Sequence, residues 1–366
     1  MKIAIDGYEL GREARGVGRV IDNILMPLVD LLPQDEFMIY TKESIGKYSH
    51  PRASEHVLTY CGGYLRWQNG PLRRALRRSE PDILLATNYI LPLVNPWKSV
   101  LFEHDISVIS HPEWYPHKYS LPRRSLIKRS LKKATRVVVP SEFTKKETLA
   151  SFNLNPEKIK VIYYGVEDKF RRAHQDKVLA WKEKKGLTGK RVVGYLGSIF
   201  KRRHIPSLVR AVSLLRGEFP ETMLYVVGKD LSGFQPGEMA RILSPEWVRW
   251  EETLPEEEIT LFYSAVDAFA YLSEYEGFGF PPLEALACGT PVVLLRSSSL
   301  EEVFGHVAIL VGHPDEREVA VALRTALTNE TERGRLLEKF DQKRAQFSWQ
   351  KTARELARLL QGLKSA

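Results

Sequence analysis

Residues 273–293, SEYEGFGFPPLEALACGTPVV, read as a loop, a short helix and a strand in immediate succession. Two adjacent prolines lack backbone N–H groups and suit the first turn of a helix, while Gly289 suits its end. The apolar run that follows has the composition of a buried strand. The stretch therefore predicts one unit of an α/β fold, with Glu276 on the loop and Glu284 in the first turn of the helix.

The same alternation of strand and helix extends over the whole chain. Ten apolar runs have the character of strands: KIAIDG, EFMIYT, DILLAT, SVLFEHD, RVVVPS, RVVGYLGS, MLYVVGKD, DAFAYLS, TPVVLL and VAILVG. Their alternation with helices predicts parallel sheets covered on both faces. The length of 366 residues favours two domains. We expect doubly wound domains at 1–170 and 191–349, with the polar segment 171–190 as a linker.

Composition excludes several classes of protein. Cys61 and Cys288 stand alone, without CxxC spacing, so neither disulfides nor a structural zinc site is expected. No secretory signal is recognisable, and no apolar run approaches the roughly 20 residues that span a bilayer. A cytoplasmic location is the expectation.

The formal charge of +9 is concentrated in two N-terminal stretches, 66–79 (RWQNGPLRRALRRS) and 123–136 (RRSLIKRSLKKATR). In the second, Leu126, Ile127 and Leu131 recur at near-helical spacing. Such a helix suits an anionic membrane surface, but a solvated basic face over a core gives the same pattern. Both interpretations stay open. No zinc-finger spacing and no RNP-like motif points to nucleic acid.

In doubly wound sheets, ligands bind beyond the carboxyl ends of the strands. After the first expected strand, Gly16 and Gly18 precede a helical pattern, where backbone N–H groups can approach an anion, although a tight turn explains them nearly as well. His104 directly follows another strand, where an imidazole can position or relay a proton. A lone histidine is more often structural.

The second half carries the more informative loops. Gly197 is followed by Lys201, Arg202 and Arg203 before a helix, a cluster suited to a diphosphate or to a basic surface turn. The glycines beside Glu276 leave backbone amides available for an anion. Amides and cations meet phosphate, while carboxylates accept hydrogen bonds from hydroxyl groups. A nucleotide sugar has both kinds of group.

These residues also carry a family likeness. EGFGFPPLEALACGTPVV resembles the E-x7-E signature of retaining glycosyltransferases of family 4, which have the two-domain GT-B fold. Further segments agree in order along almost the whole chain: IDGYELGREARGVGRV, HDISVISHPEWYP, VPSEFTKKET, PEKIKVIYYGVEDKF, YLGSIFKRRHIPSLVRA, LPEEEITLFYSAVDAF, SSSLEEV and FSWQKTARELARLL.

The resemblance implies a role for each matching residue. The first glutamate of the signature would contact the donor sugar and the second the nucleotide ribose, while the cations after the glycine would bind the diphosphate. The implied catalytic residues are His104, Arg202, Arg203 and Glu276, and the implied donor-binding residues are Gly16, Gly18, Gly197, Ser198, Leu254, Gly277, Phe278, Gly279 and Glu284.

One residue departs from the family pattern. Arg203 stands where the family more often has lysine, and a planar guanidinium is not equivalent to a point-like ammonium. The resemblance also implies that the N-terminal domain binds the acceptor, that the C-terminal domain binds the nucleotide sugar, and that the last helix, 350–366, packs back on the N-terminal domain.

The expected reaction moves a hexose from a nucleotide diphosphate to a hydroxyl with retention. The forms HDISVISHPEWYP and GVGR look like those of bacterial polysaccharide mannosyltransferases, so the expected donor is GDP-mannose and the expected acceptor a lipid-linked or growing glycan. No DxD stretch is present, so we expect no metal and no other cofactor. The alternatives are a UDP-glucose or UDP-N-acetylglucosamine transferase, a nucleotide-sugar epimerase, and an inactive sugar-binding protein.

Overall fold

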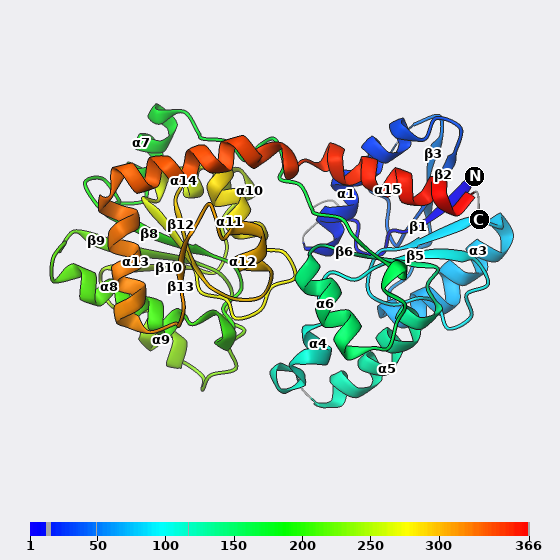
Figure 1. Ribbon diagram of the computed structural model, residues 1–366, viewed down its shortest axis with the longest axis horizontal. Coiled ribbons are helices and arrows are strands. Elements are labelled where there is room, and N and C mark those ends of the chain that lie inside the picture. Colours follow the sequence, from blue (N-terminus) through cyan, green and yellow to red (C-terminus); the bar gives the residue numbers. More distant parts are fainter. Residues whose placement is uncertain (12–15, 49, 116, 365–366) are drawn as a thin grey trace. The chain divides into compact units, whose positions relative to one another are not determined.

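The computed structural model describes residues 1–11, 16–48, 50–115 and 117–364. The chain divides into two compact units, and each is described here by itself (Figure 1). The first comprises Met1–Gly165 and Gln346–Ala366, and the second comprises Val166–Ala345.

Within the described residues, each unit holds one sheet whose paired strands are all parallel. The first has the order β3-β2-β1-β4-β5-β6-β7 and the second β10-β9-β8-β11-β12-β13. The strands are β1 Lys2–Asp6, β2 Glu36–Thr41, β3 Ala53–Val57, β4 Ile83–Ala86, β5 Lys98–Phe102, β6 Arg136–Val139, β7 Ile159–Val161, β8 Arg191–Leu196, β9 Thr222–Val227, β10 Val248–Glu251, β11 Ala268–Tyr271, β12 Val292–Leu295 and β13 Ile309–Val311.

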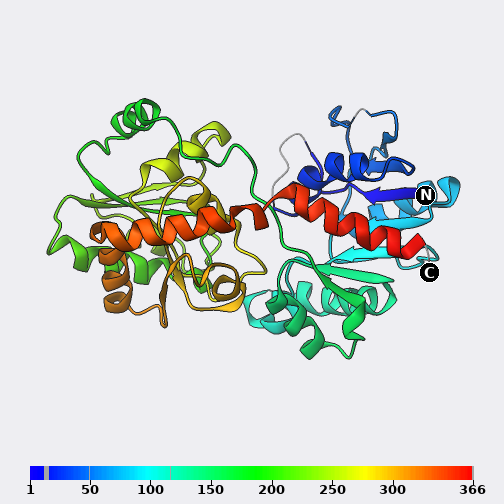
Figure 2. The same cartoon turned by 45° about the horizontal axis from the view of Figure 1, so that its top comes forward.

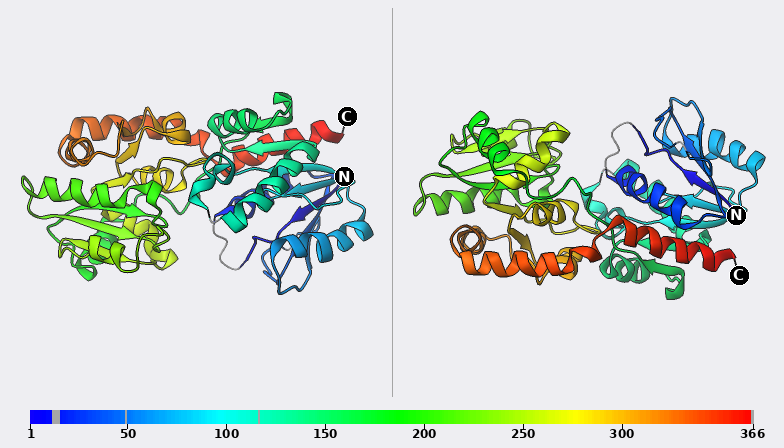
Figure 3. Two further views of the ribbon diagram at one scale, coloured as in Figure 1. Left: turned by 90° about the horizontal axis from the view of Figure 1, so that it is seen from below. Right: turned by 90° about the horizontal axis from the view of Figure 1, so that it is seen from above.

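Helices lie on both sides of each sheet (Figure 3). They are α1 Val17–Leu31, α2 Tyr64–Trp67, α3 Arg73–Ser79, α4 Ser107–Ser110, α5 His117–Lys133, α6 Glu142–Ser151, α7 Gln175–Lys184, α8 Ile205–Arg216, α9 Glu238–Ile242, α10 Glu256–Ala265, α11 Phe280–Ala287, α12 Ser298–Phe304, α13 Glu316–Thr328, α14 Glu330–Lys343 and α15 Trp349–Lys364. Short helical turns η1 Gln68–Leu72, η2 Pro112–Trp114, η3 Pro156–Lys158, η4 Lys201–Arg203 and η5 Arg344–Gln346 complete the set. The prediction of two doubly wound α/β units is confirmed.

The segment 171–190, expected to be a linker, lies inside the second unit. Its helix α7 is anchored because the ring of Trp181 stacks on that of Tyr225 at 5.9 Å between centroids, and its Nε1 donates to Glu258 at 3.1 Å. The chain instead passes between the units after Gly165 and after Ala345. The expected linker was wrong because α7 buries a single residue, Trp181, so the segment's sequence is polar although its helix is anchored.

Helix α15 belongs to the first unit and packs beside α1 (Figure 2). The Thr352 hydroxyl donates to the Tyr163 carbonyl at 2.8 Å, and Lys98 Nζ donates to the Leu363 carbonyl at 2.9 Å. These bonds tie both ends of the helix to the first sheet.

The basic stretches bury their apolar residues. Leu72 and Leu76 of the first stretch, and Ile127 and Leu131 of the second, belong to the core of the first unit. The structure thus favours the interpretation as solvated basic faces over a core. Among the described helices, none combines the length and apolar character needed to cross a membrane.

Both sheets have a topological switch point, where consecutive connections leave a central strand in opposite directions. It lies between β1 and β4 in the first sheet and between β8 and β11 in the second. Ligands of doubly wound sheets bind at the carboxyl ends of the strands at such points. The loops after these four strands are therefore where a site is expected.

Candidate active site

In the second unit, the loops after β8 and β11 are joined by three polar contacts. The Glu274 N–H donates to the Arg202 carbonyl at 2.9 Å, and the His204 ring pairs with the Glu274 carboxylate at 2.6 Å. The third contact is an ion pair between Arg203 and Glu276. The structure thus brings the predicted basic cluster and the first glutamate of the signature together.

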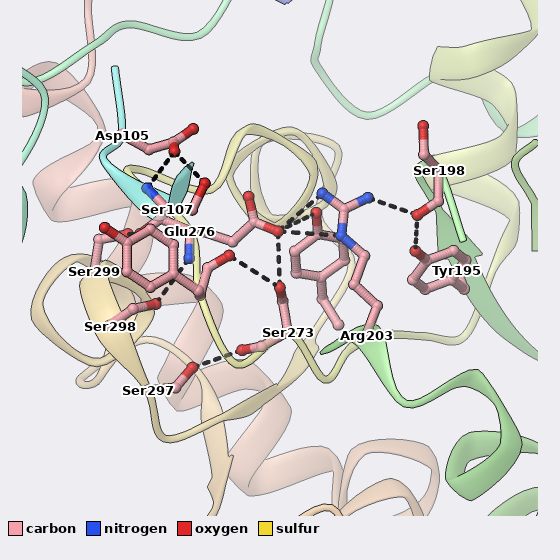
Figure 4. A network of polar contacts seen from close by, with 12 residues as sticks. Asp105, Ser107, Tyr195, Ser198, Arg203, Ser273, Glu276, Ser297, Ser298 and Ser299 are labelled. Carbon is pink, nitrogen blue, oxygen red and sulfur yellow. Dashed lines mark hydrogen bonds and ion pairs between the residues drawn. The ribbon is translucent and has the colours of Figure 1, made fainter. Parts of the chain in front are cut away.

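The Glu276 carboxylate is held through one of its two oxygens (Figure 4). Oε1 accepts from Arg203 Nη2 at 2.9 Å and Nε at 3.2 Å, from the Tyr271 hydroxyl at 2.9 Å, and from the Ser273 hydroxyl at 2.8 Å. Within the described part of the chain, Oε2 has no hydrogen-bond partner. The carboxylate is therefore fixed in place while one oxygen keeps its acceptor capacity for a ligand.

The electrostatics keep both partners charged. Burial acts to raise the pKa of Glu276, but the Arg203 charge and the hydrogen bond from Ser273 outweigh it, so the pKa lies below its usual value. Burial acts to lower the pKa of Arg203, and the Glu276 charge holds it well above its usual value. Glu276 is consequently an acceptor at neutral pH and is ill suited to act as a proton donor.

Three consecutive serines at the start of α12 hold the backbone of this loop, and sequence reasoning gave them no role. The Glu276 N–H donates to Ser298 Oγ at 3.0 Å, Ser299 Oγ donates to the Glu276 carbonyl at 2.8 Å, and Ser297 Oγ donates to the Ser273 carbonyl at 2.6 Å. The signal in the sequence was the run SSS one residue after β12, the strand that neighbours β11.

The loop amides are less available than expected. The Glu276 N–H is already bonded to serine, and Gly277 also has an interaction partner within the protein. Phe278 is buried and its ring packs against that of Phe280, 5.6 Å away between centroids. Ligand contacts from this loop therefore cannot rest on a row of free N–H groups.

Helix α11 begins one residue before the prolines, at Phe280, with Gly279 as its N-cap at φ 106°. A side chain at Gly279 would meet Leu300 at 2.8 Å, so glycine lets the helix start close to α12. Glu284 therefore lies in the second turn, and its placement in the first turn was wrong. It is buried at 4% exposure, and its Oε2 accepts from the Tyr263 hydroxyl at 2.8 Å.

The remaining predicted residues of this unit lie on neighbouring loops. Gly197 and Ser198 directly follow β8, and the Ser198 carbonyl accepts from Arg203 Nη1 at 2.8 Å and from the Tyr195 hydroxyl at 2.9 Å. The Arg202 guanidinium lies over the Phe200 ring, 4.2 Å from its centroid. Leu254 is buried and lies between β10 and α10.

In the first unit, a pocket of about 850 Å³ lies at the switch point between β1 and β4, and sequence reasoning missed it. Glu9 follows β1 and accepts from Asn88, which follows β4, at 2.7 Å. Arg66 lines the wall, and Arg123 lies 5.4 Å from the centroid of the Tyr89 ring. The pocket combines hydroxyl-binding groups, an aromatic ring and two cations.

Backbone strain marks the same loops. Among the described residues, positive φ at non-glycine positions occurs at Tyr89, His204 and Ser298, as well as at Glu80. The first lines the pocket, and the next two flank the Glu276 site. Such strain persists only where surrounding structure enforces it, and it clusters at functional sites.

His104 follows β5, and both of its ring nitrogens are engaged. Nε2 lies 2.9 Å from the Thr87 carbonyl, which can only accept, so Nε2 carries the proton and Nδ1 accepts from the Tyr164 hydroxyl at 2.6 Å. Burial lowers the pKa of the ring. A proton relay through His104 would require the bond to Tyr164 to break, so the geometry favours the structural reading of this residue.

The two glycines of the first loop lie at the start of α1. Gly16 is its N-cap. Gly18, two residues later, is buried in the first turn of the helix. The preceding segment 12–15 lies outside the described residues. Gly16, Gly18 and His104 thus belong to the first unit, whereas the other predicted site residues belong to the second.

Asp6, at the end of β1, lies behind the pocket wall. Its Oδ2 accepts from the hydroxyl of Tyr64, a lining residue, at 2.8 Å, and Oδ1 accepts from the Tyr8 N–H at 3.3 Å. Burial raises the pKa of Asp6 to about 7, against the opposing hydrogen bond from Tyr64. The group is therefore about half protonated near pH 7 and largely neutral in the folded protein below about pH 6.

This raised pKa predicts a pH-dependent stability difference. Between about pH 4 and pH 7 the unfolded chain releases the proton of Asp6 while the folded chain retains it, so Asp6 destabilises the fold increasingly as pH rises, by about 4 kcal/mol in the limit. We expect Asp6→Asn, compared with wild type by denaturant unfolding, to gain relative stability from pH 5 to pH 8. A pH-independent difference would contradict the raised pKa.

Two doubly wound units, each with polar groups gathered at its switch point, are the architecture of GT-B glycosyltransferases. The Anabaena protein Alr3699/HepE, solved in complex with UDP-glucose, superposes with a TM-score of 0.79 at 18% identity, covering 99% of this chain and all of that one. At this identity the likeness establishes the GT-B fold alone.

The sequence matches Glycosyltransferase Family 4 over residues 28–170 and Glycosyl transferases group 1 over residues 178–345. The chain belongs to this glycosyltransferase family and is a hexosyltransferase. It is 28% identical to the O-antigen chain mannosyltransferase B of Escherichia coli over 75% of this chain and 73% of that protein. It is 24% identical to the serotype-specific mannosyltransferase WbdA of Escherichia coli, covering 91% of this chain but only 42% of that protein.

Proposed function

We propose that this glycosyltransferase transfers mannose from GDP-mannose, with retention of configuration, to a hydroxyl of a lipid-linked or growing glycan in polysaccharide synthesis. The observation that carries the proposal is the Glu276 site at the switch point of the second unit, where one carboxylate oxygen is fixed and the other is open to a hydroxyl. The choice of mannose follows the O-antigen mannosyltransferases that the chain resembles.

In this proposal Glu276 Oε2 accepts a hydrogen bond from a hydroxyl of the donor sugar, and Glu284 contacts the ribose of the nucleotide. Glu276 is not the nucleophile of a double displacement, because its charge is neutralised by Arg203 and its bound oxygen is saturated with donors. The acceptor oxygen instead attacks the anomeric carbon on the face that the leaving group departs from. The bond to the β-phosphate oxygen breaks, and that phosphate takes the acceptor proton.

The departing diphosphate needs positive charge, which Arg202 and Lys201 on η4 would supply. No DxD stretch is present to hold a cation. Within the described chain, no group of three or more histidine, cysteine, aspartate or glutamate side chains is arranged to hold a metal ion. We therefore propose that transfer proceeds without added metal.

The acceptor would occupy the pocket of the first unit. Glu9 and Asn88 suit sugar hydroxyls, the Tyr89 ring suits an apolar sugar face, and Arg66 and Arg123 suit the phosphate of a lipid linkage. The exposed Arg74, Arg77 and Arg78 of α3 would hold the protein near an anionic membrane surface.

A donor panel tests the proposal. With a lipid-linked acceptor and in the presence of EDTA, we expect the protein to turn over GDP-mannose. The rate should be at least tenfold above the rates with UDP-glucose, UDP-N-acetylglucosamine or ADP-glucose. It should also be higher when the acceptor is in anionic vesicles than when it is in neutral vesicles. Preference for a UDP-sugar would replace the donor assignment. Release of an epimerised sugar without an acceptor would instead indicate an epimerase. No turnover of any donor would indicate an inactive sugar-binding protein.

A further inference from the structure

All three guanidinium nitrogens of Arg203 are engaged inside the second unit. Nε and Nη2 donate to Glu276 Oε1, and Nη1 donates to the Ser198 carbonyl at 2.8 Å. The group also lies 5.0 Å from the centroid of the Tyr271 ring and 5.4 Å from that of Phe200. Its side chain is only 11% exposed. Arg203 is thus a packed part of the loop framework.

A diphosphate ligand would have to take these N–H groups away from their present partners. Doing so would leave the Glu276 carboxylate, 17% exposed, without its counter-charge. Breaking a buried ion pair costs about 3–5 kcal/mol. The neighbouring Arg202 and Lys201, on the same helical turn, can meet an anion without breaking the ion pair between Arg203 and Glu276.

We propose that Arg203 is a positioning residue: it fixes the Glu276 carboxylate so that Oε2 is presented to the donor sugar, and it does not itself bind the diphosphate. This inference rests on the proposed function, in which Glu276 accepts a sugar hydroxyl. Figure 4 shows the second oxygen of Glu276 directed away from Ser273, with Arg203 between Glu276 and Ser198, a residue of the loop that carries Arg203 itself.

The geometry accounts for arginine at a position where the family more often has lysine. The planar guanidinium holds Glu276 with two N–H groups and reaches the Ser198 carbonyl with a third, so it fixes the distance between the two loops. A single ammonium nitrogen on a flexible stem cannot reproduce that fork. Lysine would keep the charge and lose the orientation.

The role predicts a separation between nucleotide binding and catalysis. The affinity for free GDP, which lacks the sugar, should change by less than about threefold in Arg203→Gln and Arg203→Lys. The value of kcat should fall by about 10- to 100-fold in both, since a misoriented group near the reacting centre costs that much. Because Arg203 lowers the pKa of Glu276, the acid limb of the pH–rate profile should move to higher pH in Arg203→Gln.

The experiment measures GDP affinity by calorimetry, with kcat and its pH profile, for the full-length wild type, both Arg203 variants and Arg202→Gln. Arg202→Gln is the matched control, and its GDP affinity should fall about tenfold or more because a charge-assisted phosphate contact is lost. If Arg203→Gln does not fold, the GDP affinity and kcat of Arg203→Lys test the inference by themselves, because that variant keeps the positive charge.

Two results would overturn the inference. One is a tenfold or larger loss of GDP affinity in the Arg203 variants, and the other is wild-type kcat in Arg203→Lys. A wild-type protein that binds neither GDP nor UDP would instead refute the proposed function, and this inference with it. The wild-type and variant measurements therefore separate the two failures.

Discussion

Replacing Glu276 with glutamine should lower kcat for sugar transfer by about 10²- to 10³-fold, the range found when one preorganised contact to a developing charge is removed. The amide keeps the size of the side chain but removes the charge that Arg203 and the bonded hydroxyl groups surround. Free GDP should still bind within about threefold, because GDP lacks the sugar that Glu276 contacts in the proposed function. Steady-state transfer kinetics and calorimetry measure the two quantities.

Glu274 offers a matched control two residues earlier on the same loop. Its side chain is 44% exposed and pairs with His204, so Glu274→Gln should keep kcat within a few-fold of wild type. Equal losses in both variants would show that the loop tolerates no substitution. Full activity in Glu276→Gln would refute the role assigned to this carboxylate.

Gly228→Ala should destabilise the second unit and impair donor binding together. A Cβ atom at this position would lie 1.9 Å from the Gly197 carbonyl oxygen, so the backbone after β8 must move. Overpacking of this kind costs about 1–3 kcal/mol, or roughly 3–10 °C in melting temperature. Because Gly197 precedes the carbonyl that Arg203 binds, the shift should also lower kcat about tenfold or more.

Gly334→Ala is the control, because it makes the same substitution at a position where a Cβ atom meets no neighbouring atom. Gly334 lies within α14, and nothing is found within 4 Å of a Cβ placed there. Helix propensity predicts a small gain in stability, about 0.5–1 kcal/mol. Thermal unfolding and transfer assays on both variants test the pair, and a Gly228→Ala protein with wild-type melting temperature and kcat would contradict the close approach of the two backbones.

The interior strands could be predicted from sequence because both of their faces are buried. β1, β4 and β8 appear as continuous apolar runs, which parallel sheets require. The strands that the sequence did not reveal, β3, β7 and β10, lie at sheet edges. In β10 all four residues are only partly buried, so no apolar run marks it. Edge pairing depends on the neighbouring strand more than on the segment's own composition.

The residue types of the Glu276 site could be predicted, but their arrangement could not. The sequence places Arg203 and Glu276 on different loops, and only the order of the sheet, with β8 beside β11, brings them into one ion pair. This pairing is the basis on which we propose Arg203 as a partner of the carboxylate in place of a phosphate ligand. For His104 the sequence shows that the residue follows a strand, but it does not show that the Tyr164 hydroxyl donates to the Nδ1 atom of the ring.

The first-unit pocket illustrates why some sites leave no sequence motif. Glu9 and Asn88 are 79 positions apart and have unremarkable neighbours. They meet because β1 and β4 are adjacent at the switch point. A composite of this kind becomes visible only when strand order is known.

NMR of the reaction as it proceeds tests retaining mannosyl transfer from GDP-mannose most directly. With wild-type protein, GDP-mannose and a lipid-linked glycan acceptor, we predict that the newly formed glycosidic bond has the same anomeric configuration as the donor, from the first turnover onward. A product of inverted configuration, or consumption of GDP-mannose with no mannose on the acceptor, would contradict the account.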